Sequence, residues 1–141
     1  MKYVIDASIG FKWAVVEPLA DKARQLQEDF RNGIHELLAP DLFPTEVANA
    51  LLVSERRGRV LPGQGSLLLT DILLELPHIH PAVLSLPRAY EIAHQTRASV
   101  YDCLYVALAE REGCELVTAD SRLVNTLGPR YPFMIGLASL P

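Results

Sequence analysis

The chain opens with Lys2-Tyr3-Val4-Ile5-Asp6-Ala7-Ser8, a short apolar and partly β-branched run that ends at an acidic residue. A second run of the same kind, Glu115-Leu116-Val117-Thr118-Ala119-Asp120, closes in the same way. Runs of this length and composition predict buried strands. Because a helical pattern follows each run, we expect parallel strands whose carboxyl ends bring Asp6 and Asp120 to one edge of a sheet.

Strand and helix patterns alternate along the rest of the chain. Further strands are expected at residues 34–39, 78–83 and 133–137. Apolar residues at helical spacing, bounded by Pro, Ser and Gly, indicate helices at residues 8–13, 19–31, 44–57, 62–76, 86–96, 100–112 and 121–127. This order predicts a single domain over residues 1–141, an α/β fold with a parallel sheet covered on both faces by helices.

The composition fits one compact domain and limits the kinds of partner. Half of the 141 residues are apolar and 21% are charged, which excludes wholesale disorder. The net charge of −4 argues against a strongly basic nucleic-acid binder. It does not exclude a nuclease, because an acidic metal site contributes negative charge that bound divalent ions offset.

Cysteine usage and hydropathy indicate a cytoplasmic protein. Cys103 and Cys114 form no CxxC motif, and we expect both to be small hydrophobic residues in a reducing cytosol. No signal peptide is apparent before the first strand, and no apolar stretch approaches the length of a membrane span.

Two further acidic residues, Glu46 and Asp102, each lie in the first turn of an expected helix. Each of the four acids has a structural explanation by itself, since Asp caps helices and acids in a first turn suit the helix dipole. Four carboxylates at one rim of a sheet are harder to explain, because they repel each other unless a cation lies between them. An all-carboxylate site favours Mg²⁺ or Mn²⁺, which can activate water and stabilise the leaving oxygen of a phosphodiester.

Four short blocks around these acids resemble, in their order and spacing, the signature blocks of PIN domains. They are Val4-Ile5-Asp6-Ala7-Ser8, Pro44-Thr45-Glu46-Val47-Ala48-Asn49-Ala50, Tyr101-Asp102-Cys103-Leu104-Tyr105-Val106-Ala107-Leu108-Ala109 and Leu116-Val117-Thr118-Ala119-Asp120. The resemblance is strongest to the VapC toxins of toxin–antitoxin pairs, and it runs from Lys2 to about Leu137.

This resemblance implies a three-layer α/β/α sandwich and a Mg²⁺- or Mn²⁺-dependent endoribonuclease, the toxin of a VapBC-type pair. Four positions match the acidic quartet of the family: Asp6, Glu46, Asp102 and Asp120. Asp6, Asp102 and Asp120 are expected to bind the metal, while Glu46 binds a second ion or orients the attacking water. Ser8 and Thr118 match the small hydroxyl positions that support the first and last acids.

The resemblance also implies an RNA substrate, a homodimer and a cognate antitoxin that covers the site. The helices contain more apolar residues than a small sheet needs for cover, which is consistent with a two-fold interface. These residues are Leu51, Leu67, Leu68, Leu69 and Leu73. The helix at residues 62–76 is also a candidate to form an antitoxin groove.

Other functions stay open at this point. One is a housekeeping PIN-type nuclease that acts in RNA processing or on DNA, and another is a non-catalytic domain that binds RNA or protein. A phosphoacceptor receiver would need two adjacent acids after its first strand. A phosphatase with an Asp nucleophile would need an acid where Ser8 stands, so both are disfavoured.

Basic residues give a weaker signal. Arg56, Arg57 and Arg59 cluster at the end of the helix that carries Glu46, and Lys12 follows Asp6 by six positions. These four residues are candidates to hold RNA phosphates, or an acidic antitoxin tail in the case of the arginines. The alternative is a solvated helix end, where positive charge suits the dipole.

Two other patterns are expected to be structural. His78 and His80 share one face of an expected strand, but no third zinc ligand lies near them, so we interpret them as exposed edge histidines. One stripe of the helix at residues 100–112 is expected to lie in the core rather than to stack on bases: Tyr101, Leu104, Tyr105 and Leu108.

Overall fold

Five parallel strands form the middle layer of the fold in the computed structural model, which describes residues 1–141. They are β1 (Lys2–Ile5), β2 (Glu36–Pro40), β3 (His78–His80), β4 (Glu115–Thr118) and β5 (Met134–Gly136). The strand order is β3-β2-β1-β4-β5, so the first strand is central. Following the chain, β2 and then β3 add to one side of β1, whereas β4 and then β5 add to its other side. The direction of winding therefore reverses between β1 and β4, where ligand sites of open α/β sheets lie.

The central strands are apolar on both faces, because helices cover both. Val4 and Ile5 of β1 and Leu116 and Val117 of β4 are fully buried. Val4 pairs with Leu116, and Ile5 pairs with Val117. This near-continuous apolar pattern is typical of strands inside a parallel sheet.

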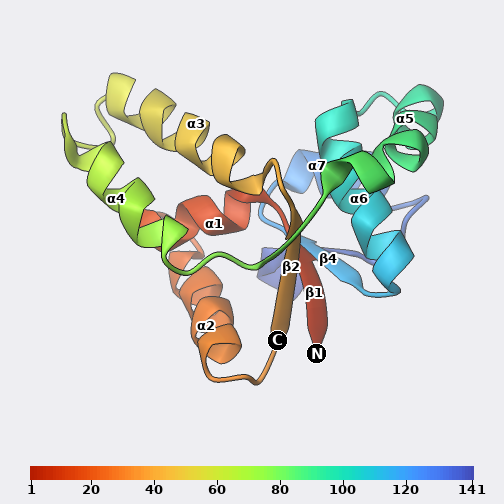
Figure 1. The fold of residues 1–141 in the computed structure, drawn as a ribbon, viewed down its shortest axis with the longest axis horizontal. Coiled ribbons are helices and arrows are strands. Elements are labelled where there is room, and N and C mark those ends of the chain that lie inside the picture. The colour runs from red at the N-terminus through yellow and green to blue at the C-terminus, as the bar shows by residue number, and fades with distance from the viewer.

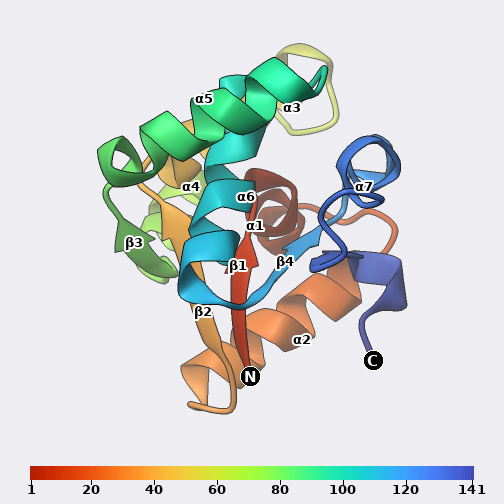
Figure 2. The same cartoon turned by 90° about the vertical axis from the view of Figure 1, so that its right-hand side faces the viewer.

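Seven α-helices and two short 3₁₀ helices complete the fold. They are α1 (Ala7–Ala14), α2 (Ala20–Arg31), α3 (Phe43–Arg56), α4 (Gln64–Leu73), α5 (Leu86–Gln95), α6 (Val100–Glu112), α7 (Ser121–Leu127), η1 (Ala82–Ser85) and η2 (Leu137–Ser139). Helices α1 to α4 lie on one side of the sheet, and α5 and α6 lie on the other (Figure 1). Figure 2 shows α5 and α6 in front of the strands, with α7 beside β4. The predicted α/β/α arrangement is therefore confirmed, and none of the helices has the length and apolar character needed to cross a membrane.

The largest differences between predicted and observed ends concern two elements, a strand and a helix. The strand expected at residues 78–83 stops at His80, because Pro81 has no N–H for the ladder and a 3₁₀ helix follows. The Asp41 carboxylate accepts a hydrogen bond from the Ala82 N–H at 3.2 Å, which stabilises this turn. The helix expected from Pro62 begins at Gln64, because Gly63 has a left-handed backbone with φ of 82°.

Gly10 permits close contact between α1 and α3, the two helices that carry Ser8 and Glu46. A Cβ atom at position 10 would lie 2.6 Å from Cζ of Phe43 and 3.0 Å from Cγ2 of Val47. Both side chains are fully buried and have little room to move. The absence of a side chain at Gly10 therefore fixes how near α3 comes to the end of β1.

We expect Gly10→Ala to lower the free energy of unfolding by about 1–3 kcal/mol, because it overpacks a rigid contact. This loss should exceed the gain of about 1 kcal/mol that alanine brings to a helix interior. Urea unfolding measures it. Gly65→Ala is the control, since its only contact closer than 3.4 Å would be with Oε1 of Glu55, the end of a long side chain, and its other neighbours lie at ordinary contact distances. Equal stability of the two variants would contradict the packing argument.

Candidate active site

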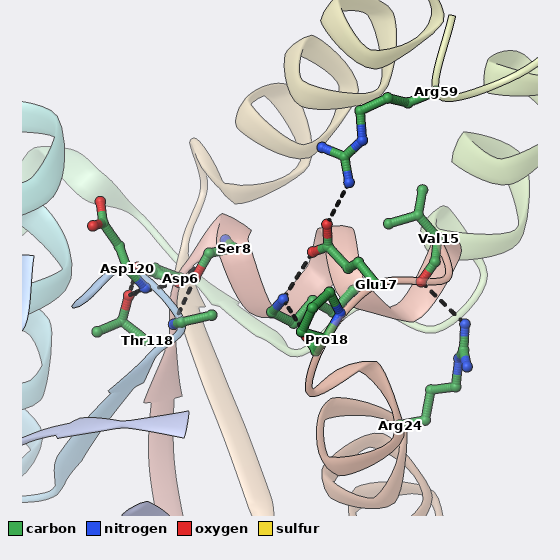
Figure 3. Close-up of polar contacts among 11 residues, drawn as sticks. Asp6, Ser8, Val15, Glu17, Pro18, Arg24, Arg59, Thr118 and Asp120 are labelled. Carbon is green, nitrogen blue, oxygen red and sulfur yellow. Dashed lines mark hydrogen bonds and ion pairs between the residues drawn. The ribbon is translucent and has the colours of Figure 1, made fainter. Parts of the chain in front are cut away.

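Asp6 follows β1 directly and is buried at the carboxyl edge of the sheet, with 8% of its surface exposed. It caps α1, since its Oδ1 accepts hydrogen bonds from the Ser8 N–H at 3.1 Å and from the Ser8 hydroxyl at 2.5 Å. Its Oδ2 accepts from the Thr118 hydroxyl at 2.5 Å. Thr118 is the last residue of β4, so one carboxylate joins the ends of two neighbouring strands (Figure 3).

Ser8 and Thr118 also hold the segment that leads to Asp120. The Ala119 N–H donates to the Ser8 hydroxyl at 2.9 Å, and the Asp120 N–H donates to the Thr118 hydroxyl at 3.1 Å. Asp120 is exposed, and its Oδ1 accepts from the N–H groups of the first turn of α7. The two hydroxyls therefore connect the first and last acids of the quartet through short hydrogen bonds.

Glu46 and Asp102 come from opposite sides of the sheet. Glu46 lies in the first turn of α3, and Asp102 lies in the first turn of α6 behind the cap Ser99. The hydroxyl of Tyr105, one turn after Asp102, donates to Oε1 of Glu46 at 2.6 Å. Tyr105 is 2% exposed. It was predicted only as a core residue, yet it orients an acid, and its spacing of three from Asp102 was the available signal.

Burial, with a further contribution from a neighbouring acid, raises the pKa of three of the four acids. Burial raises the pKa of Asp6 to about 6, against the hydrogen bonds from Ser8 and Thr118, and the charge of Asp102 adds to this rise. Burial also raises the pKa of Glu46, with Asp102 as a further cause. The pKa of Asp102 is raised by burial and by Asp120. No Lys, Arg or His side chain forms an ion pair with any of the four.

This donor set fits Mg²⁺ or Mn²⁺, which bind carboxylate oxygens and retain water. In the present rotamers no three acidic, His or Cys side chains gather closely enough to hold an ion. The reason is that Asp6, Glu46 and Asp120 each point at a protein donor instead of at one another.

Two of the basic residues predicted to bind RNA, Lys12 and Arg59, form ion pairs with Glu17. The Glu17 carboxylate accepts from Nζ of Lys12 at 2.9 Å and from Nη2 of Arg59 at 2.8 Å (Figure 3). Lys12 also donates to the Pro18 carbonyl at 2.7 Å. Lys12 and Arg59 therefore join α1, the loop after it and the loop after α3, and the structure does not bring them to the quartet. Arg56 and Arg57 are exposed, and their role in RNA binding stays a prediction.

Sequence reasoning missed two arginines beside the acids. Arg97 and Arg122 line a hollow of about 290 Å³ together with Asp102 and Asp120. Arg122 lies two residues after Asp120, and Arg97 lies two residues before the cap Ser99. Their closeness in sequence to the acids was the signal that could have identified them.

The stripe predicted for α6 needs one correction. Leu104, Tyr105 and Leu108 are buried as expected, but Tyr101 is 66% exposed. The reason is that Tyr101 lies in the first turn of α6, beyond the edge of the layer that the helix covers. Cys103 is buried, and burial raises its thiol pKa to about 11, which fits a small apolar residue.

The parallel sheet, whose winding direction reverses between β1 and β4, defines an α/β domain. Acids lie at the carboxyl ends of its central strands, so the point of reversal is a candidate cation site. The model of the PIN domain family matches residues 3–127. The chain therefore belongs to the PIN domain family, and the resemblance to its VapC-type members is confirmed by the relatives it matches.

Among these relatives is Ribonuclease VapC3 from Pyrobaculum aerophilum, 33% identical over 137 residues, 96% of this chain and 98% of the relative. The crystal structure of PAE2754 from the same organism superposes with a TM-score of 0.70 at 24% identity, over 99% of this chain and 94% of the other. That of VapBC2 from Rickettsia felis, bound to a DNA fragment from their promoter, gives a TM-score of 0.64 at 17% identity, over 96% of this chain and 97% of the other. These two structures support the fold.

The metal-free protein is expected to lose stability as the pH rises from about 4 to about 6. Asp6 keeps its proton up to a pH of about 6 in the folded state, whereas the unfolded chain releases it near 3.8. Because the folded state binds the extra proton in this window, its free energy of unfolding falls there, by about 3 kcal/mol.

Asp6→Asn should remove this part of the pH dependence and should be more stable than the wild type above pH 6. Urea unfolding of both proteins in EDTA between pH 4 and pH 8 measures the difference. Parallel curves for the two proteins would show that Asp6 is ionised in the folded state at a normal pKa.

Proposed function

We propose that this protein is a metal-dependent endoribonuclease that acts in the cytoplasm as the toxin of a VapBC-type toxin–antitoxin pair. The observation that carries the proposal is that four acids at the carboxyl edge of the central strands of a PIN domain influence one another's charge and have no cationic partner. A relative named as a ribonuclease, 33% identical over nearly the whole chain, supports RNA as the substrate.

The acids have distinct roles in this proposal. Asp6, Asp102 and Asp120 hold Mg²⁺ or Mn²⁺, and Glu46 either holds a second ion or orients the attacking water. When bound, the metal would supply the Lewis acidity needed to activate water and to stabilise the leaving oxygen of the phosphodiester.

The chain's own residues prepare this chemistry. Ser8 and Thr118 hold the Asp6 carboxylate by two hydroxyl hydrogen bonds, which fixes it at the end of β1. Tyr105 binds Oε1 of Glu46, which leaves Oε2 of the same carboxylate for water. Because its pKa is raised, the Glu46 carboxylate is a stronger base than an ordinary Glu side chain and accepts a proton from water more readily.

An antitoxin and a second copy of the chain are the proposed partners. The VapBC2 structure, which resembles this fold, supports the antitoxin. Apolar side chains on α3 and α4 support a covered surface: Leu52, Leu67 and Leu73 are exposed, while Leu68 and Leu69 are half-buried. Leu51 packs into the core, so it has no part in such a surface.

Purified protein without antitoxin should cleave RNA in Mg²⁺ or Mn²⁺ and stop in EDTA. Asp6→Asn and Asp102→Asn should each lower the cleavage rate by several orders of magnitude, because each removes a charged ligand. Gel analysis of end-labelled RNA measures the rate.

Asp21→Asn is the matched control, since Asp21 is an exposed acid in the first turn of α2, away from the site. It should cut at the wild-type rate. Undiminished cleavage in EDTA would contradict the metal mechanism, and wild-type activity of Asp6→Asn would place the chemistry elsewhere.

The protein should sediment as a dimer at micromolar concentration, because the exposed leucines of α3 and α4 are more stable when covered. Leu67→Glu should shift it toward the monomer, since it places a charge on this surface. Tyr90→Glu serves as the control, because Tyr90 is exposed on α5, on the other side of the sheet. A monomeric wild type in sedimentation velocity would refute the dimer.

A further inference from the structure

A hollow beside the acids is the feature from which this inference starts. It has a volume of about 290 Å³, near the low end of the sizes that hold a drug-sized ligand. Arg97 and Ser99 line it from the α5–α6 loop, Asp102 lines it from α6, and Asp120 and Arg122 line it from the start of α7. Two of the proposed metal-binding acids and two arginines therefore share one concave surface.

The two arginines are free to bind an anion. Most other basic side chains are already engaged, such as Arg88 with Glu110 and Arg130 with the Gln95 carbonyl. Five of the Lys and Arg side chains make no hydrogen bond and no ion pair: those of Arg56, Arg57, Arg97, Arg111 and Arg122. Two of these five line the same hollow.

The carboxylates of the hollow do not neutralise these arginines. Asp102 and Asp120 line the same surface, yet neither lies within 4.0 Å of an Arg nitrogen. The acids therefore stay available for a cation and the arginines for an anion. The hollow also contains the cap of α6, a helix of thirteen residues, whose N-terminal dipole favours negative charge nearby.

We propose that Arg97 and Arg122 bind the RNA backbone phosphate that adjoins the one being cut. The inference rests on the proposed ribonuclease function and adds to it a subsite that positions the substrate. A phosphate bound by the two arginines would share this hollow with Asp102 and Asp120, and we therefore assign it to the linkage next to the one that the proposed metal would hold. Arginine suits this role because its planar guanidinium binds phosphate through paired N–H donors. Such contacts carry no base information, so the subsite positions RNA of any sequence.

The test measures how RNA affinity depends on salt. All proteins carry Asp6→Asn, so that RNA binds in Mg²⁺ without being cut, and the probe is a short fluorescent single-stranded RNA of random sequence. Arg97→Gln and Arg122→Gln should each weaken binding about tenfold. Each should also reduce the slope of log K against log salt by about 0.7, the value for one lost phosphate contact on a single strand.

Arg111→Gln is the matched control, because Arg111 is an equally unpaired arginine at the opposite end of α6. It should keep the affinity and the salt slope of the parent. Arg97→Lys should restore the slope, since lysine keeps the charge, and melting curves should show that all variants fold. A slope for Arg97→Gln and Arg122→Gln equal to that of Arg111→Gln would overturn the subsite.

Cleavage by the same variants without Asp6→Asn separates this inference from the proposed function. A protein that binds RNA but never cuts it would refute the ribonuclease, while the salt slopes would still decide the role of the arginines. A protein that binds no RNA at low salt would overturn both. If a variant with both Arg97→Gln and Arg122→Gln binds RNA normally but loses affinity for a poly-glutamate peptide, the hollow binds an acidic protein segment, and the RNA subsite is wrong.

Discussion

The hydrogen bonds that Ser8 and Thr118 donate to the buried Asp6 carboxylate are the contacts on which the site depends. A carboxylate with 8% exposure is costly in the folded state unless donors replace the water it has lost. Two hydroxyls and the Ser8 N–H do so, and they come from β4 and from the first turn of α1. Because one carboxylate connects two adjacent parallel strands, the position of Asp6 and the course of the chain toward Asp120 are fixed together.

The acidic residues of the site lack the cationic partners that several acidic residues elsewhere in the protein have. Glu17 is paired with Lys12 and Arg59, and Glu110 is paired with Arg88, so hydrogen bonding to these cations lowers the pKa of both acids. At the carboxyl edge of the sheet the opposite holds, since burial and neighbouring acids raise the pKa of Asp6, Glu46 and Asp102. Glu17 and Glu110 are thus neutralised by cations, whereas the candidate ligands stay unpaired. This is the pattern expected where function is obtained at a cost in stability.

The four acids of the quartet come from elements on both sides of the sheet and from the strand ends between them. Glu46 comes from the side of α1 to α4 and Asp102 from the side of α5 and α6, with Asp6 and Asp120 between them at the ends of β1 and β4 (Figure 1). The hydrogen bond between Tyr105 and Glu46 crosses this division and joins α6 to α3. On the outer side of Asp102, the hollow with Arg97 and Arg122 extends the site beyond the acids. An extended chain of phosphates would therefore meet negative ligands for metal and positive ligands for phosphate side by side.

The sequence by itself determined the order and type of the elements, because apolar periodicity and the Pro, Gly and Ser boundaries are local signals. It also determined which acids are candidates, since strand ends and first turns can be recognised locally. Only the tertiary structure decided which charges pair, as Lys12 and Arg59 meet a Glu17 that periodicity says nothing about. It likewise decided that Tyr105 faces Glu46, 59 positions away, and that Arg97 and Arg122 share a hollow. The physical reason is that pairing and concavity depend on distances between elements, which arise when helices pack on the sheet and are absent from any single segment.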